Sequence, residues 1–588
     1  MSVTQATFAA TLADEWVRSG VTDAVVCPGS RSAPLALALA ERAELRVHVR
    51  LDERGAGFFA LGLAMATGRP PVVCTTSGTA AAELHPAVVE AHYGRVPVIV
   101  CTADRPPELQ GVGAPQTIDQ RGLFGSAVRW SADPGVPVES TRRTWRALAA
   151  RAVLEASAGP TGPGPVHLNL AFREPLLAEA GPLPAGGADG RPSVRVGTAP
   201  GTAPGTVPGT APGPAAGTAP GPGGATGADA ARTWHRRRGV LVAGAGAGPP
   251  ELVLALAEAL GWPVLADPRS GCRTDHPAVV GAADALLRSE AVGTALRPEV
   301  AVVLGSPWTS KALGAWLAGA GGEIVAVDPW WRWADPDRMV STVHRADPAG
   351  WLVAAASGAR GGPTGGAWLG RWRAAEAAAQ RAIDDVLAGG FTEPAVARRL
   401  YGLLSPGTTV VASSSMPVRE LEWYAPPVAE PPPVLANRGA NGIDGVCSTA
   451  LGAAAAGSGP VVGLVGDLAF LHDASALVRP AGAPRTACTL VVVDNGGGGI
   501  FDFLPQAAAV ERSRFEQLFG TPQAPDVARV AAGFGLDVAD AGSFDELGAA
   551  LAAGVEVVRI RVPDRRANVA VHDRIHRAAA AAAVQALG

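Results

Sequence analysis

Short runs of β-branched residues, each ending in Gly, Ser or Asp and each followed by a helical pattern, constrain the fold of this chain more than any other feature. In the first 180 residues these runs are DAVVCPG, PPVVCTTSG, VPVIVCTAD and GPVHLNL. Apolar strands that alternate with helices are typical of a parallel sheet covered on both faces. The pattern restarts at GVLVAGAGAG and again at GTTVVASSS, PVVGLVGDL, CTLVVVDN and VEVVRIRV. We therefore predict an α/β protein with three doubly wound parallel-sheet domains.

The domain limits follow from length and composition. At 588 residues the chain is too long for a single core. Residues 197–224 form a Gly-Thr-Ala-Pro repeat with nothing apolar to bury, which is typical of a flexible linker. We predict an N-terminal domain over 1–183, a linker over 184–232, a central domain over 233–358 and a C-terminal domain over 367–588.

Charge and hydropathy argue against several classes of protein. Lys and Arg number 49 against 53 Asp and Glu, so the chain lacks the basic surface of a protein that binds nucleic acid or membranes. The start, MSVTQATFAATLADEWVRSG, predicts an amphipathic helix and not a signal peptide. Polar residues and a proline interrupt the apolar window 451–471, which predicts a buried helix and strand and not a membrane span. The six cysteines are scattered, which predicts reduced buried thiols in a cytoplasmic protein.

Two turns in the C-terminal third carry the strongest functional signal. Asp467 ends the run VVGLVGD, and Asn495 ends the run VVVDN. The segment GGGGIFDF follows directly after Asn495. One helix and one strand fit between them, so both turns are expected at the carboxyl edge of neighbouring parallel strands, where ligands of such sheets bind. Carboxylate, amide and carbonyl oxygens suit Mg²⁺, and glycines let a diphosphate approach the backbone. The sequence predicts a phosphorylated ligand bridged to a metal.

The pair GDL and DN resembles the diphosphate–metal motif of thiamine-diphosphate enzymes, whose usual form is GDG followed by NN; Leu468 and Asp494 differ from the commonest letters. The resemblance implies thiamine diphosphate beside Gly466, with Asp467, Asn495 and the carbonyl of Gly497 holding Mg²⁺ or Mn²⁺. It also implies a dimer or larger assembly whose sites lie between chains.

The same resemblance assigns a catalytic role to Glu53, in LDERGAGFFALGLAMATG. A carboxylate at this place hydrogen-bonds to the aminopyrimidine ring and activates the cofactor. Taken alone, Glu53 is better explained as an acid that favours a helix N-terminus. Together with the two turns it becomes the leading catalytic candidate.

Polar and cationic side chains recur in the other strand–helix turns. Arg binds carboxylates through two parallel hydrogen bonds, so several such turns favour substrates with more than one carboxylate. Any one of these residues alone is better explained by a surface or capping role. The predicted substrate-binding residues are Ser30, Arg31, Arg105, Gln116, Lys311, Ser415, Arg419 and Arg438. Ile443 is predicted to pack against a cofactor or substrate ring, with a core role equally open.

Several stretches closely resemble the 2-succinyl-5-enolpyruvyl-6-hydroxy-3-cyclohexene-1-carboxylate (SEPHCHC) synthases of menaquinone biosynthesis: CPGSRSAPL, LDERGAGFFALGLA, TADRPPEL, NRGANGIDG and DNGGGGIF. The resemblance is weak in the middle domain, where Ala312 follows Lys311 in place of a second basic residue. It implies decarboxylation of 2-oxoglutarate and conjugate addition of the resulting four-carbon carbanion to isochorismate, in a homodimer or homotetramer.

Three other functions stay open at this point. An acetolactate-synthase-like enzyme would use pyruvate, but its single carboxylate leaves the many cationic turns unexplained. A non-catalytic regulatory protein of the same fold would not need Glu53. An NAD-linked oxidoreductase would use GAGAG (244–248), although Pro249 and Pro250 stand where the dinucleotide fingerprint needs its last glycine.

Overall fold

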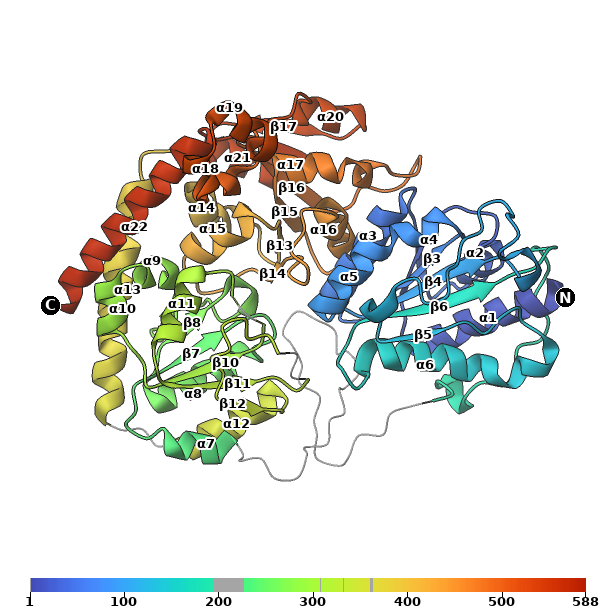
Figure 1. Cartoon of the computed structure of the whole chain (residues 1–588), viewed down its shortest axis with the longest axis horizontal. Helices are drawn as coiled ribbons and strands as arrows, with labels where there is room; N and C mark the ends of the chain where they lie inside the picture. Colours follow the sequence, from blue (N-terminus) through green and yellow to red (C-terminus); the bar gives the residue numbers. More distant parts are fainter. Residues whose placement is uncertain (1, 195–226, 307, 331–332, 360–362) are drawn as a thin grey trace.

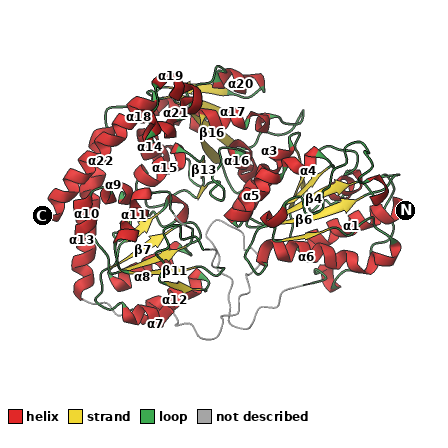
Figure 2. Ribbon diagram, viewed as in Figure 1, coloured by secondary structure: helices red, strands yellow, loops and turns green. Residues whose placement is uncertain are grey.

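The part of the chain that the structure describes forms three six-stranded sheets, and every strand pairing in them is parallel. The computed structural model describes residues 2–194, 227–306, 308–330, 333–359 and 363–588. Figure 1 shows one α/β body for the N-terminal part (blue), one for the central part (green) and one for the C-terminal part (orange to red). In each body the strands lie inside and helices cover both faces (Figure 2), which confirms the predicted fold class. The Gly-Thr-Ala-Pro repeat lies outside the described residues.

The N-terminal sheet has the order β2-β1-β3-β4-β6-β5. Phe8, Leu12 and Trp16 of the first helix pack on one face, as the amphipathic start of the sequence predicts. The strands are β1 Asp23–Val26, β2 Arg46–Val49, β3 Val72–Thr75, β4 Val98–Asp104, β5 Trp130–Ala132 and β6 Pro165–Ala171. The helices are α1 Ser2–Arg18, α2 Ala33–Ala40, α3 Glu53–Thr67, α4 Thr79–Glu83, α5 His85–Gly94 and α6 Trp145–Ala158.

The central sheet has the order β12-β11-β10-β7-β8-β9. Its glycine turn packs on the chain itself, because a Cβ at Gly244 would lie 1.7 Å from the carbonyl oxygen of Ser306. This contact favours a structural role for GAGAG over dinucleotide binding. The strands are β7 Gly239–Ala243, β8 Val264–Ala266, β9 Val279–Val280, β10 Val300–Leu304, β11 Glu323–Val327 and β12 Thr342–His344. The helices are α7 Gly227–Thr233, α8 Pro250–Leu260, α9 Ala283–Leu287, α10 Glu290–Ala295, α11 Lys311–Gly319 and α12 Pro348–Gly358.

The C-terminal sheet has the order β14-β13-β15-β16-β18-β17, so β15 and β16 are neighbours as predicted. The strands are β13 Thr409–Ala412, β14 Val434–Leu435, β15 Val461–Gly466, β16 Cys488–Asp494, β17 Val538–Ala541 and β18 Val557–Arg561. The helices are α13 Pro363–Leu387, α14 Glu393–Arg399, α15 Met416–Tyr424, α16 Val446–Ala455, α17 Asp467–His472, α18 Gln506–Ala509, α19 Arg512–Phe515, α20 Val527–Gly533, α21 Phe544–Ala552 and α22 Arg565–Leu587.

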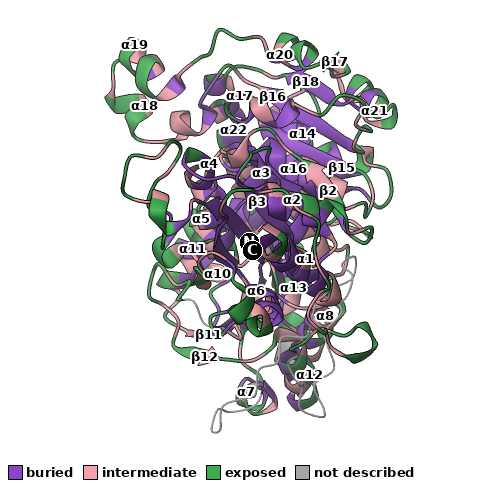
Figure 3. Cartoon of the chain, turned by 90° about the vertical axis from the view of Figure 1, so that its right-hand side faces the viewer, coloured by how far each residue is buried: buried purple, intermediate pink, exposed green. Residues whose placement is uncertain are grey.

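The N- and C-terminal bodies meet where α3 crosses α16 (Figure 1). A Cβ at Gly62 would lie 2.0 Å from the carbonyl oxygen of Thr449, and a Cβ at Gly452 would lie 2.0 Å from that of Phe59. Only glycine permits so close a crossing. The crossing is buried, as the purple α3, α16 and β15 in Figure 3 show, so it fixes the two bodies relative to each other.

Two further findings bear on the chemical environment. All six cysteines are buried free thiols. Among the described helices, none combines the length and the apolar character that crossing a membrane requires.

Candidate active site

The predicted site residues share one position in the fold: each lies at the carboxyl end of a strand, in the loop that follows it, or in the first turn of the next helix. Ligands of open parallel sheets bind at this edge. The residues are Ser30 and Arg31 after β1, Glu53 after β2, Arg105 and Gln116 after β4, Lys311 after β10, Ser415 and Arg419 after β13, Arg438 and Ile443 after β14, Gly466 and Asp467 at the end of β15, and Asn495 and Gly497 after β16.

The two turns that the sequence predicts to hold a metal are joined directly. Asp467 begins α17, is 7% exposed, and accepts a 2.8 Å hydrogen bond through Oδ2 from the backbone N–H of Gly497. Its other oxygen accepts from the N–H of Leu468 at 2.8 Å. A Cβ at Gly466 would meet no atom of the chain within 4 Å. The turns therefore form one unit, with space beside Gly466.

The glycine run after Asn495 is explained in large part by the chain's own backbone. Gly497 has a φ of 134°, and a Cβ there would lie 2.1 Å from the carbonyl oxygen of Gly520. A Cβ at Gly498 would lie 2.5 Å from the carbonyl oxygen of Phe519. The sequence interpretation attributed these glycines to a phosphorylated ligand. The structure adds a packing reason that the sequence did not reveal.

The electrostatics of this edge suit a cation. Burial raises the pKa of Asp467 to about 6, and the neighbouring Asp494 adds to the shift. Glu393 is hydrogen-bonded to Asn495. Burial raises the pKa of Glu393 well above its usual range, and repulsion from Glu420 adds to the shift. A bound cation would favour the ionised carboxylate of Asp467, whose charge burial otherwise disfavours.

The residues present fit a hard divalent metal. Asn495 Nδ2 donates a 2.9 Å hydrogen bond to Glu393 Oε1, while Asn495 Oδ1 is buried and has no hydrogen-bond partner among the described residues. A buried oxygen without a partner calls for an explanation, and at a sheet edge that also presents Asp467 a bound ion supplies one. The described residues contain no cluster of three or more His, Cys, Asp or Glu that could hold a metal ion. The donor set is instead one carboxylate, one amide and backbone carbonyls, which leaves positions for phosphate and water.

Glu53 is the first residue of α3, and Asp52 caps this helix by accepting from the N–H of Arg54 at 3.0 Å. The Glu53 side chain is half-buried. Burial raises its pKa, and the charges of Asp52 and Glu83 add to the shift. A raised pKa moves the carboxyl group toward the range in which an acid or base is most effective at neutral pH. Because Asp52 performs the capping, the helix start does not require Glu53 for this role.

The polar residues of the N-terminal domain come together around Ser77. Arg105 Nη1 donates to Ser77 Oγ, Ser77 Oγ donates to the carbonyl of Gln116 at 3.0 Å, and Gln116 Nε2 donates to the carbonyl of Ser77 at 3.0 Å. Gln116 has a φ of 54°, a strained value for this residue type. Burial lowers the pKa of Arg105, and the charge of Arg31 lowers it further. Two cations therefore lie close together beside strained backbone, and Arg31 also pairs with Glu174 at 3.1 Å.

A second group of cations lies where the C-terminal and central domains meet. Arg419 Nη1 donates a 2.5 Å hydrogen bond to the carbonyl of Ser415, whose φ is 73°. Burial lowers the pKa of Arg438 to about 10, and the charges of Arg269 and Arg419 contribute. Glu422 accepts hydrogen bonds from the two N–H groups that precede Lys311 and so links α11 to this group. Ile443 packs against the core of the C-terminal domain.

The two cationic groups belong to different parts of the fold: Arg31 and Arg105 follow strands of the N-terminal sheet, and Arg419 and Arg438 follow strands of the C-terminal sheet. The N-terminal domain does contact the C-terminal one, since Glu90 accepts from the N–H groups of 439–441 at 2.5–3.2 Å.

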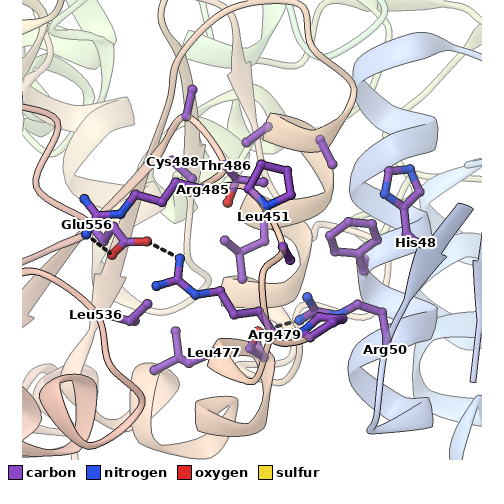
Figure 4. A pocket seen from close by; sticks show the side chains of 18 of the residues that line it. His48, Arg50, Leu451, Leu477, Arg479, Arg485, Thr486, Cys488, Leu536 and Glu556 are labelled. Carbon is purple, nitrogen blue, oxygen red and sulfur yellow. Dashed lines mark hydrogen bonds and ion pairs between the residues drawn. The ribbon is translucent and has the colours of Figure 1, made fainter. Parts of the chain in front are cut away.

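A cavity of about 500 Å³ lies between the N- and C-terminal domains, away from the predicted site (Figure 4). Its wall includes His48, Arg50 and Leu451, and Arg479 there pairs with Glu556 at 2.6 Å. None of the predicted site residues lines it. The arginines of this cavity are paired with other groups of the chain and are not available to bind substrate carboxylates. We therefore do not assign the active site to this cavity.

Sequence reasoning missed three residues of these groups. Glu393 follows a capping Thr and looks like an ordinary helix start, Arg269 stands in an unremarkable DPRSG turn, and Ser77 precedes a glycine. Their roles depend on contacts between distant segments, which single-sequence patterns do not report.

Comparisons with known proteins agree with this geometry. The chain matches the N-terminal TPP binding domain of thiamine pyrophosphate enzymes over residues 6–123, their middle domain over 225–410 and their C-terminal TPP binding domain over 423–562. It is 42% identical to the SEPHCHC synthase of Chloroflexus aurantiacus over 89% of this chain and 87% of the relative. It is 41% identical to those of Myxococcus xanthus (97% and 96% covered) and Thermobifida fusca (97% and 98% covered). The chain is therefore a member of the SEPHCHC synthase family of thiamine pyrophosphate enzymes.

Proposed function

We propose that the chain catalyses the thiamine-diphosphate-dependent reaction of 2-oxoglutarate with isochorismate, which releases CO₂ and gives SEPHCHC for menaquinone biosynthesis. The observation that carries the proposal is the meeting of Asp467, Gly497 and the free amide oxygen of Asn495 at one sheet edge. When bound there, thiamine diphosphate supplies a nucleophilic carbon and an electron sink for decarboxylation of a 2-oxo acid.

Each residue has a separate task in this proposal. Asp467, Asn495 and the carbonyl of Gly497 hold Mg²⁺ or Mn²⁺, and Gly466 leaves room for the diphosphate. Glu53, with its raised pKa, exchanges a proton with the aminopyrimidine ring. Ile443, at the edge of the C-terminal core, packs against the bound ring system.

The two cationic groups bind the carboxylates of the two substrates. Charge-assisted hydrogen bonds from arginine orient carboxylates strongly, and positioning of two reactants lowers the barrier to their reaction. The proximity of Arg31 to Arg105, and of Arg419 to Arg438, supports this role because each pair of arginines can donate to the carboxylates of one substrate. The members of the two groups are Ser30, Arg31, Arg105 and Gln116 on the N-terminal side, and Lys311, Ser415, Arg419 and Arg438 on the other.

We also propose that the working form is a homodimer or homotetramer with each site between two chains, as the resemblance to thiamine-diphosphate enzymes implies. Mixing Glu53→Gln chains with Asp467→Ala chains tests this arrangement. If a site uses residues of two chains, the mixed assembly regains activity that neither variant has alone. A mixture that stays inactive, with mixed assemblies present, contradicts it.

The assay for the activity supplies isochorismate and 2-oxoglutarate with thiamine diphosphate and Mg²⁺. We expect isochorismate consumption with CO₂ release, and none when 2-oxoglutarate, the cofactor or the metal is left out. Pyruvate in place of 2-oxoglutarate is the matched control. Turnover of pyruvate without turnover of 2-oxoglutarate would refute the proposed substrate.

A further inference from the structure

Glu393 is a buried carboxyl group that reaches the predicted metal site from a distant part of the sequence. It begins α14, is 3% exposed, and accepts a 2.9 Å hydrogen bond through Oε1 from Asn495 Nδ2. Thr392 caps this helix through its own side chain, so the helix start does not need Glu393. Burying a carboxyl group is costly, and placing it here calls for a compensating role.

The contact decides which way the Asn495 amide faces. An asparagine side chain has a donor end and an acceptor end of nearly the same shape, and turning it by half a revolution exchanges them. An ionised Glu393 can only accept hydrogen bonds, and its Oε1 accepts from Asn495 Nδ2, so the NH₂ end of the amide faces it. The oxygen end then faces the other side, where Oδ1 is buried without a partner among the described residues.

Gly499 makes this arrangement possible. A Cβ at this position would lie 2.8 Å from Asn495 Nδ2 and would push the amide out of place. The last glycine of the run therefore leaves room for the amide group. The amide is confined by Gly499 and oriented by Glu393.

We propose that Glu393 is a positioning residue that holds the amide of Asn495 with its oxygen toward the divalent metal. The inference rests on the proposed function, in which Asn495 is a metal ligand. Partners that orient metal ligands typically contribute about 10–100-fold to metal affinity. Glu393 itself does not touch the metal; it acts through Asn495.

The test measures binding of Mn²⁺ to the full chain with thiamine diphosphate present, by electron paramagnetic resonance. In Glu393→Ala the amide is free to turn, and we expect the dissociation constant of Mn²⁺ to rise about 10–100-fold. In Glu393→Gln the side-chain carbonyl accepts the same hydrogen bond, so we expect most of the affinity to return. Glu376→Ala is the matched control, because Glu376 is also a buried acid, but it accepts its backbone hydrogen bonds from Gly281 and Ala282 of the central domain and not from Asn495.

Thermal unfolding of each variant without ligands shows whether Glu393→Ala folds. If it does not fold, a second pair of variants, which exchanges donor and acceptor between positions 495 and 393, still tests the proposal. Asn495→Asp alone sets two carboxyl groups against each other. Adding Glu393→Gln restores a hydrogen bond with donor and acceptor exchanged, and we expect the double variant to bind Mn²⁺ at least about 10-fold more tightly than Asn495→Asp.

The outcomes separate this inference from the proposed function. If the unaltered chain with thiamine diphosphate does not bind Mn²⁺, both are refuted. If it binds, but Glu393→Ala equals Glu376→Ala, or Glu393→Gln is as weak as Glu393→Ala, or the exchange gives no recovery, only the positioning role of Glu393 is refuted.

Discussion

Asp467 Oδ2 accepts a hydrogen bond from the backbone N–H of Gly497 at 2.8 Å, and this bond ties the turn after β15 to the turn after β16. The bond forms within the chain itself, so the two turns are arranged before any ligand binds. Preorganisation of this kind reduces the entropic cost of binding. Changes at either turn are therefore expected to act on cofactor affinity more than on the sheet.

Replacing Glu53 by Gln should remove the proton exchange while keeping the size of the side chain. We expect turnover of isochorismate to fall about 10²–10⁴-fold, the usual contribution of a positioned acid or base. Thiamine diphosphate binding, measured by calorimetry, should persist. Glu41→Gln, at an exposed position beyond the end of α2, is the control and should keep full turnover. Undiminished turnover in Glu53→Gln would remove the catalytic role of this residue.

Replacing Arg105 or Arg438 by Ala should weaken the handling of the carboxylate substrates. A lost charge-assisted hydrogen bond costs about 1.5–3 kcal/mol, so we expect kcat/KM for a substrate to fall about 10–100-fold while cofactor binding stays intact. The control is Arg121→Ala, which removes an exposed ion pair with Asp133 in the same domain and should change little. Unchanged substrate kinetics in both test variants would contradict the two anion-binding groups.

Replacing Gly62 by Ala should force α3 away from α16. The new Cβ would lie 2.0 Å from the carbonyl oxygen of Thr449, which is backbone and cannot rotate away. We expect the free energy of unfolding to fall by about 1–3 kcal/mol, the usual cost of overpacking. Gly370→Ala is the matched control: Gly370 lies exposed in α13, a Cβ there meets nothing within 4 Å, and the change should stabilise by up to about 1 kcal/mol. Thermal unfolding of both variants measures the difference, and equal shifts would contradict the close crossing.

The buried His167 should make stability depend on pH. Burial lowers the pKa of His167 to about 4, from 6.5, beside Thr102 Oγ1 at 2.8 Å. Between these values the unfolded chain binds a proton that the folded chain does not, so stability falls as the pH falls through this window. From neutral pH to about pH 5 the loss is about 2 kcal/mol. His167→Gln should show a smaller fall in melting temperature between these pH values, and an identical fall would exclude His167 as the source.

The fold and the main site were accessible from sequence because both depend on local patterns. The apolar runs predicted β1, β3, β4 and β6 of the N-terminal sheet, and the order of strands and helices placed Asp467 and Asn495 on neighbouring strands. Both predictions are confirmed by the sheet topology. The domain limits and the roles of individual site residues stay predictions.

What the sequence did not reveal depends on contacts between distant segments. The hydrogen bond from Asn495 to Glu393 spans 102 positions of the chain. The approach of Gly497 and Gly498 to the backbone of 519–520 is invisible without coordinates, and the glycines were attributed to a ligand alone. Local periodicity reports which face of a strand or helix is buried, but not which partner covers it.

The contact of Gly62 with Thr449 also has a consequence for folding during synthesis, because it can form only after both helices have been made. Helix α3 is synthesised early, whereas α16, which covers it, lies about 390 residues later in the chain. Helix α16 therefore leaves the ribosome well after α3. At about 5–20 residues per second the apolar face around Phe59 waits roughly 20–80 s for its cover. During that interval the N-terminal domain exposes this apolar surface to solvent. A chaperone would be needed there, and premature aggregation would begin there.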